Sequence, residues 1–160
     1  MQAYTWEDGA QVKRTGRRSD CPINFALQTF GDAWSLLLLR DLMFTDRRTY
    51  TDFLGAGEGI ATNVLAARLK RLQAEGLIRK VGRGRGATYQ LTDKGLDLLP
   101  AMLELISWSA RHDSRTAAPP EFVARIRSDR QRLARELRER LSQQHGLAGS
   151  SRESRKRGAP

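Results

Sequence analysis

The stretch ATNVLAARLKRLQAEGLIRK (residues 61–80) determines which fold the chain can adopt. It has the pattern of a helix that ends near Gly76 and is followed by the start of a strand. Leu65, Leu69 and Leu72 fall on one side of a helical wheel and predict a face that packs against a core. Alanines, cations and Asn63 occupy other positions. The helix could be an ordinary core helix or could present its outer face to DNA, and the neighbouring sequence must decide.

Three helices are expected before this stretch. Pro22 suits the first position of a helix, and Gly31 can end it. Asp32 predicts the N-cap of a second helix, whose apolar residues cover most of its circumference, so that helix should be central and buried. Thr49 can cap a short third helix, and glycines connect this helix to the stretch quoted above.

A basic, glycine-rich hairpin is expected after the stretch. Residues 77–81 and 87–91 carry apolar side chains in the manner of strands, and the Gly-Arg-Gly-Arg-Gly segment between them is too flexible for a helix. Thr92 predicts the cap of a long helix that Pro100 should bend or break. The predicted fold class is therefore mainly α with a small β-hairpin, in the order of a winged helix-turn-helix.

The chain is expected to hold one such domain with extensions at both ends. Residues 1–20 predict a flexible N-terminal arm, whose basic residues either lie in solvent or contact DNA. The domain spans residues 21–113, and residues 114–120 form a linker. Residues 121–144 predict a single amphipathic helix with an apolar stripe too narrow to form its own core, so it must dock on something. Residues 145–160 predict a disordered basic tail.

The distribution of charge favours a nucleic-acid partner. The chain has 28 Lys and Arg against 18 Asp and Glu, a net charge of +10, which indicates a polyanionic partner such as nucleic acid or an anionic membrane. A basic protein without such a partner is the alternative. Residues 68–85 carry a net +6, whereas the rest of residues 22–112 carries a net −3. A basic patch on a mildly acidic body is typical of a nucleic-acid footprint.

Other classes of protein are not supported by the sequence. Cys21 is the single cysteine, so an intrachain disulfide is excluded. No apolar run approaches the roughly 20 residues that span a bilayer, and the first residues lack the apolar core of a signal peptide. We expect a cytoplasmic, nucleoid-associated protein. His112 and His145 lack partners at metal-ligand spacing, and no P-loop, dinucleotide motif or nucleophile elbow occurs, so no metal, cofactor or catalysis is expected.

The quoted helix supplies the predicted contacts to bases. On the helical wheel, its alanines and Asn63 lie opposite or nearly opposite the leucines. Asn63 can pair bidentately with adenine, and small side chains let the backbone approach the groove. The predicted base-reading residues are Thr62, Asn63, Ala66 and Ala67. The predicted phosphate contacts are Arg47, Arg48, Arg68, Lys70, Arg71, Arg83 and Arg85. Arg68 lies nearer the apolar side, so a structural ion pair is an equal alternative for it.

Three segments resemble a known family. DCPINFALQTFGDAWSLLLLRDLMF, RRTYTDFLGAGEGIATNVLAARLKRLQAEGLI and YQLTDKGLDLLPAMLELISW are similar to the HxlR-type winged helix-turn-helix regulators, relatives of the MarR group. The resemblance covers roughly residues 20–112. It implies a homodimeric bacterial transcription factor on a (pseudo)palindromic operator, with helix 62–75 in the major groove and wing 82–87 on the minor groove or the backbone. The alternative is a non-specific architectural nucleic-acid-binding protein.

The resemblance also implies roles for residues outside the recognition helix. It places dimer contacts on the first helix and on the long helix after the wing, with the candidates Ile23, Leu27, Leu103, Ile106 and Trp108. Cys21 matches a cysteine that several members use to sense oxidants or electrophiles, so an oxidant or small-molecule signal is implied; a packed structural cysteine is the alternative. Two positions depart from the family pattern. Ala33 replaces a common lysine, and Ala67 replaces a residue that is polar in many members.

Overall fold

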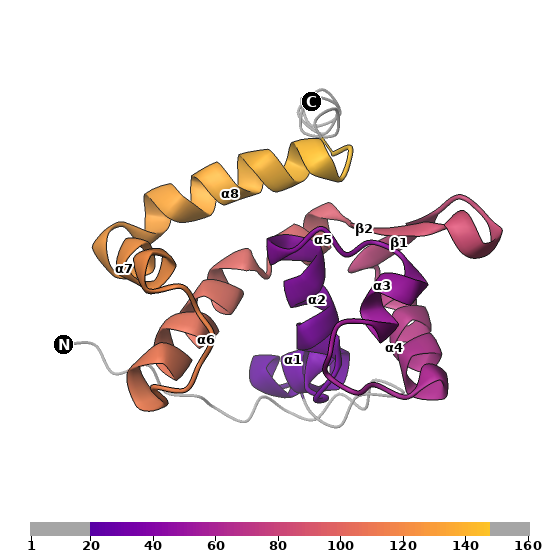
Figure 1. Ribbon diagram of the computed structural model, residues 1–160, viewed down its shortest axis with the longest axis horizontal. Coiled ribbons are helices and arrows are strands. Elements are labelled where there is room, and N and C mark those ends of the chain that lie inside the picture. Colours follow the sequence, from indigo (N-terminus) through magenta and orange to yellow (C-terminus); the bar gives the residue numbers. More distant parts are fainter. Residues whose placement is uncertain (1–19, 148–160) are drawn as a thin grey trace.

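The computed structural model describes residues 20–147, which contain a winged helix-turn-helix followed by two further helices (Figure 1). The predicted fold class is confirmed. The elements are α1 (Pro22–Phe30), α2 (Ser35–Phe44), α3 (Tyr50–Leu54), α4 (Thr62–Ala74), β1 (Ile78–Val81), the 3-10 turn η1 (Gly84–Gly86), β2 (Thr88–Leu91), α5 (Asp93–Leu96), α6 (Leu99–His112), α7 (Pro120–Ser128) and α8 (Arg130–Gln144).

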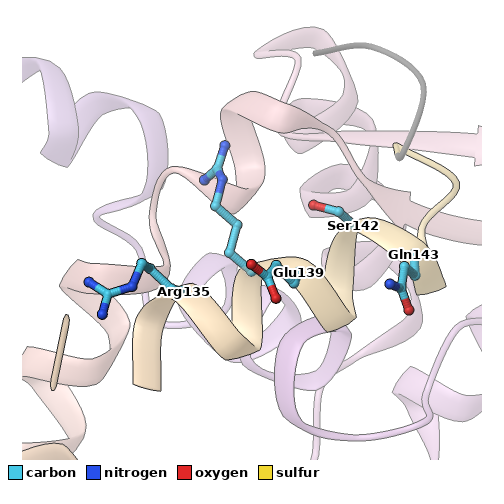
Figure 2. A pocket seen from close by; sticks show the side chains of 5 residues that line it. Arg135, Glu139, Ser142 and Gln143 are labelled. Atoms are coloured by element: carbon cyan, nitrogen blue, oxygen red, sulfur yellow. The ribbon is translucent and has the colours of Figure 1, made fainter. Parts of the chain in front are cut away.

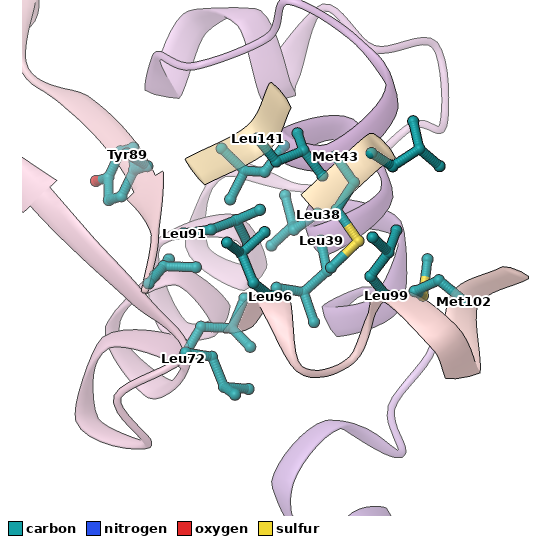
Figure 3. Packing of buried hydrophobic residues seen from close by; sticks show 14 of the residues in the cluster. Leu38, Leu39, Met43, Leu72, Tyr89, Leu91, Leu96, Leu99, Met102 and Leu141 are labelled. Atoms are coloured by element: carbon teal, nitrogen blue, oxygen red, sulfur yellow. The ribbon is translucent and has the colours of Figure 1, made fainter. Parts of the chain in front are cut away.

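Helix α2 lies at the centre of the core, as its apolar sequence predicts. Leu38, Leu39, Leu42 and Met43 are all buried. Leucines from α4, β2, α5, α6 and α8 belong to the same buried cluster, and Figure 3 shows part of this packing around α2. Because one helix is covered from several sides, the positions of the other elements depend on it.

The caps expected at Thr49 and Thr92 are confirmed, whereas the N-cap of α2 is Trp34 and not Asp32, which lies two residues earlier. Asp32 accepts hydrogen bonds from the backbone amides of Trp34 and Ser35, at 2.9 and 3.0 Å, at the start of α2. Thr49 forms a capping box at the start of α3. Thr92 accepts a hydrogen bond from the amide of Gly95 and so caps α5.

The wing is a two-stranded antiparallel sheet. Ile78 of β1 lies opposite Leu91 of β2, and Val81 lies opposite Thr88. Gly82 and Gly84 have φ values of 83° and 65°, a conformation that glycine adopts without strain. The backbone of the turn therefore explains why glycine occupies these positions. At the base of the hairpin, a Cβ added to Gly95 would lie 2.2 Å from the carbonyl oxygen of Leu77, so α5 can pack there only with glycine.

The helix after the wing is interrupted, as the sequence predicts. Helix α5 ends at Leu96, and α6 begins at Leu99. Pro100 occupies the first turn of α6, where a residue without an N–H donor leaves no intrahelical bond unmade.

The C-terminal region differs from the expectation of one helix over residues 121–144. It contains two helices, because Asp129 ends α7 and its side chain accepts a hydrogen bond from the amide of Arg132, at 3.0 Å, as the N-cap of α8. The break lets α7 pack on α6 while α8 crosses over α5 and α6 (Figure 1). Ile126, Leu133 and Leu141 are buried in the common core, so the expected docking is confirmed.

The expectation of a disordered tail from residue 145 is wrong at its start. His145 and Leu147 are buried, with 0% and 8% of their surface exposed. Residues 148–160 lie outside the described residues, as does almost all of the expected N-terminal arm over residues 1–20. The helices of residues 20–147 are all too short or too polar to span a bilayer.

His145 makes the folded protein sensitive to acid. Burial lowers the pKa of His145 to about 4 from its usual 6.5, and the nearby Arg48 and Arg79 also lower it. Between these two values the unfolded chain binds a proton that the folded chain does not, so stability falls as the pH falls from about 6.5 towards 4.

We expect the free energy of unfolding of the wild type to decrease over this pH range by about 3 kcal/mol more than that of His145→Gln, which has no titrating ring. Urea denaturation at pH 7 and pH 4 measures this difference. The exposed His112, changed to Gln, serves as the control and should match the wild type. Parallel pH profiles for wild type and His145→Gln would contradict the assignment.

Candidate nucleic-acid interface

Helix α4 is held with its N-terminal end against α3. The turn between the two helices contains Gly57 and Gly59 at φ values of 84° and 72°. The Tyr50 hydroxyl on α3 donates a hydrogen bond to the carbonyl oxygen of Thr62, at 2.7 Å. These contacts fix the angle between the helices, and that angle determines which face of α4 is accessible.

The two faces of α4 are separated as the helical wheel predicts. Leu65, Leu69 and Leu72 are buried, with at most 2% of their surface exposed. The four predicted base-reading residues, Thr62, Asn63, Ala66 and Ala67, are all exposed on the first two turns. An exposed face with one amide side chain and two methyl groups is low enough to enter a groove.

Among the predicted phosphate-binding cations, three have no partner in the described part of the chain. Lys70 on α4 and Arg83 and Arg85 on the wing are exposed and form no hydrogen bond or ion pair with residues 20–147. Their charge is therefore available to an external anion. Arg71 is also exposed, but its guanidinium donates a hydrogen bond to the carbonyl oxygen of Gln28 on α1.

Arg68 forms the structural ion pair that the sequence left open as its alternative role. Its Nε lies 3.1 Å from a carboxylate oxygen of Asp32, whose side chain also accepts hydrogen bonds from the amides of Trp34 and Ser35. Burial alone would raise the pKa of Asp32, but hydrogen bonds from Ser35 and Trp34, together with the charge of Arg68, lower it below its usual value. Arg68 and Arg71 thus tie α4 to α1 and to the turn after it.

Arg47 and Arg48 are also used within the protein. An Arg47 guanidinium nitrogen lies 3.4 Å from the buried carboxylate of Asp41. The Arg48 guanidinium donates to the carbonyl oxygens of Thr45 and Arg47, at 2.9 and 2.8 Å, and its burial lowers its pKa. These contacts stabilise the end of α2. We therefore leave Arg48 out of the proposed DNA contacts.

The wing is attached to the core on one face and open on the other. The Tyr89 ring packs against Phe53 of α3, with ring centroids 5.9 Å apart. Lys80, opposite Tyr89 on β1, holds its ammonium group 5.9 Å from the centroid of the same ring. The remaining residues of the turn, which include Arg83 and Arg85, project into solvent.

The predicted dimer contacts divide into three groups. Ile23, Leu27 and Trp108 expose between 57% and 64% of their surface, which is unusual for large apolar side chains. Ile106 is partly buried against the core. Leu103 is completely buried within its own protomer, so its assignment to a dimer interface is wrong. Helical periodicity cannot tell the two apolar faces of α6 apart.

Cys21 is exposed and lies directly before α1, without a side-chain capping bond. Its role as a redox sensor stays a prediction. Within residues 20–147, no group of three or more His, Cys, Asp or Glu side chains is placed to hold a metal ion.

A shallow surface depression lies on the C-terminal helix, away from the basic patch. It has a volume of about 340 Å³ and is lined by residues of α8 alone, which include Arg135, Arg138 and Glu139 (Figure 2). One helix side lined by mixed charges lacks the converging apolar walls that small-molecule sites have.

Several positioning residues were not found from the sequence. Tyr50, Arg79 and His145 each join elements that are distant in the chain. Local patterns gave no signal for these contacts, since each depends on the packed fold. For Asp32 a role at the start of α2 was predicted, but its ion pair with α4 was not.

Comparisons with known proteins agree with this geometry. The sequence model of the HxlR-like helix-turn-helix family matches residues 29–117. An uncharacterised HTH-type transcriptional regulator of Mycobacterium tuberculosis is 34% identical over 98 residues, which cover 59% of this chain and 61% of the relative. The uncharacterised HTH-type transcriptional regulator YdzF of Bacillus subtilis is 28% identical over 95 residues, which cover 58% of this chain and 87% of the relative.

Two solved structures have the same fold. The crystal structure of PA1607, assigned as a transcription factor, superposes with a TM-score of 0.54 at 32% identity and covers 65% of this chain and 71% of that one. A protein of Porphyromonas gingivalis assigned to the MarR family of regulators superposes with a TM-score of 0.53 at 28% identity and covers 59% of this chain and 94% of that one.

Proposed function

Because the chain belongs to the HxlR-like helix-turn-helix family, whose members are transcriptional regulators and not enzymes, we propose that it is a sequence-specific, homodimeric regulator acting on a (pseudo)palindromic operator. Helix α4 enters the major groove, and the wing lies on the adjacent minor groove or backbone. The regulator works in the cytoplasm, on the nucleoid.

One observation carries this proposal: Lys70 on α4 and Arg83 and Arg85 on the wing are exposed and have no partner within residues 20–147, and α4 and the wing are the two elements with which a winged helix-turn-helix contacts DNA. Arg47, Arg48 and Arg68 make contacts within the described part of the chain, whereas Lys70, Arg83 and Arg85 make no hydrogen bond or ion pair there. The phosphates of a polyanion can pair with these exposed charges, and binding releases the counterions that surround the phosphates. Phosphates would thus position the protein, and Asn63 would read a base.

Dimerisation is supported by the apolar surface of α1 and α6. Ile23, Phe25 and Leu27 of α1 and Leu105 and Trp108 of α6 account for five of the six large apolar side chains exposed in the described range. A twofold axis beside these helices would bring the same residues of two copies together and place two α4 helices on one side of the dimer. The non-specific architectural role stays the alternative.

We expect Asn63→Ala to weaken binding to the operator by about 1–3 kcal/mol and to leave binding to random DNA nearly unchanged, because the amide contributes only where it meets its base. Selection of bound sites from random DNA supplies the operator, and competition titrations measure both affinities. Gln73→Ala, an exposed substitution at the other end of α4, is the control. An operator preference of the wild type below about 10³-fold would favour the architectural role.

We expect the double substitution Arg83→Ala, Arg85→Ala to weaken binding to all DNA. The negative slope of log K against log salt should become shallower by about 1.8, or about 0.9 for each lost phosphate contact. Arg127→Ala with Arg140→Ala removes the same charge from exposed positions on α7 and α8 and should leave the slope near that of the wild type. An unchanged slope in the wing variant would remove the wing from the DNA contacts.

We expect Ile23→Lys with Trp108→Lys to convert a dimer into a monomer, because two charges per chain would be buried in the apolar contact. Light scattering measures the mass in solution. Val81→Lys changes an exposed apolar residue on the wing and should leave the mass of two chains unchanged. A monomeric wild type, or a dimer that survives the double substitution, would reject this interface.

A further inference from the structure

Helices α7 and α8 follow the part of the chain that matches the family, residues 29–117. They bury their apolar stripe on the winged helix, and exposed ion pairs add further links, such as Arg138 on α8 with Asp97, at 2.9 Å. Helix α8 then ends beside the base of the hairpin (Figure 1). The buried leucines explain how α8 packs on the core of the winged helix. They do not explain the polar contacts at the C-terminal end of α8.

His145 joins the wing to the central helix through its ring. Its Nδ1 accepts a hydrogen bond from the backbone amide of Leu91 on β2, at 3.2 Å. Nε2 therefore carries the proton and donates to the carbonyl oxygen of Leu42 on α2, at 3.1 Å. The ring has no exposed surface, and its lowered pKa keeps it neutral at pH 7, as this arrangement requires.

The other strand of the wing is held at the same residue. The Arg79 guanidinium on β1 donates to the carbonyl oxygen of His145, at 2.6 Å, and to the side-chain oxygen of Gln90 on β2, at 2.9 Å. One residue after α8 thus contacts both strands of the hairpin and α2. Tyr89, the next inward residue of β2, donates its amide to the carbonyl oxygen of Arg48, at 2.7 Å.

A hairpin of this size needs such support. Each strand has four residues, and an isolated two-stranded hairpin is at best marginally stable in water. The outer edge of β2 offers the amides of Tyr89 and Leu91, and the structure gives both of them a partner from outside the sheet. Losing either partner would leave a backbone donor unpaired and would free one side of the wing.

We propose that the C-terminal helix α8 is a brace for the wing, and that His145 is its positioning residue. The brace holds β1 and β2 at a fixed angle to α2 and hence to the recognition helix α4. The consequence for DNA binding rests on the proposed function, whereas the effect on the hairpin does not.

Hydrogen exchange of the wing amides tests the brace without DNA. His145→Asn keeps an acceptor near the position of Nδ1, and His145→Gln keeps a donor near the position of Nε2. We expect about fivefold to tenfold faster exchange over residues 78–91 in the Gln variant, and near wild-type exchange in the Asn variant. Arg125→Gln, which breaks an exposed ion pair between α7 and α8, is the control. Equal exchange in the Asn and Gln variants would overturn the proposal.

A second variant avoids the core. Arg79 is exposed, so Arg79→Met should fold even if the buried substitutions do not. It removes the bond from β1 to the His145 carbonyl, and we expect faster exchange in the wing with an unchanged rate in α2. An increase spread evenly over the whole domain would show a general loss of stability and would overturn the brace.

A double-mutant cycle tests the consequence for DNA binding. We expect His145→Gln to weaken operator binding about fivefold in the wild-type background and to have almost no further effect when Arg83 and Arg85 are already alanine. The same loss in both backgrounds would overturn a role through the wing. If the wild type binds no DNA, the proposed function fails, while the exchange experiment still decides whether α8 braces the hairpin.

Discussion

The burial of one leucine stripe on α4 determines the rest of the molecule. Leu65, Leu69 and Leu72 join the core that surrounds α2, and no other face of α4 is apolar enough to take their place. The outer face, which includes Asn63, must then point into solvent. The same rotation of the helix that removes apolar surface from water creates the surface that we assign to DNA.

Ion pairing within the protein divides the cations into two classes. Asp32 forms an ion pair with Arg68, and Asp41 forms one with Arg47. Arg48 and Arg71 instead donate hydrogen bonds to backbone carbonyl oxygens. These contacts hold α1, α2 and α4 at fixed positions. A count of basic residues therefore overstates the charge available to a partner, and the fold determines which cations stay exposed without a partner within residues 20–147.

Local signals in the sequence were sufficient for most of the fold. The hydrogen bonds of Asp32 at the start of α2, the cap at Thr49 and the glycine-rich turn of the wing depend on residues within a few positions, so they could be predicted. The exposed face of α4 followed from periodicity. Contacts across the fold could not be predicted in this way. Leu103 fits the same helical periodicity as the exposed apolar residues of α6, so the periodicity did not predict its burial. His145 lies in a segment of polar composition, which gave no sign that its side chain is buried.

The contact between His145 and Leu42 also constrains the order in which the molecule can assemble. The two residues are 103 positions apart in the chain, so closing this contact costs more chain entropy than the local turns and caps of the winged helix. During synthesis, residues 20–112 emerge first and can collapse around α2 before α8 exists. The amide of Leu91, on the outer edge of the hairpin, can therefore gain its partner only after His145, which follows every other element of the described chain, has been made.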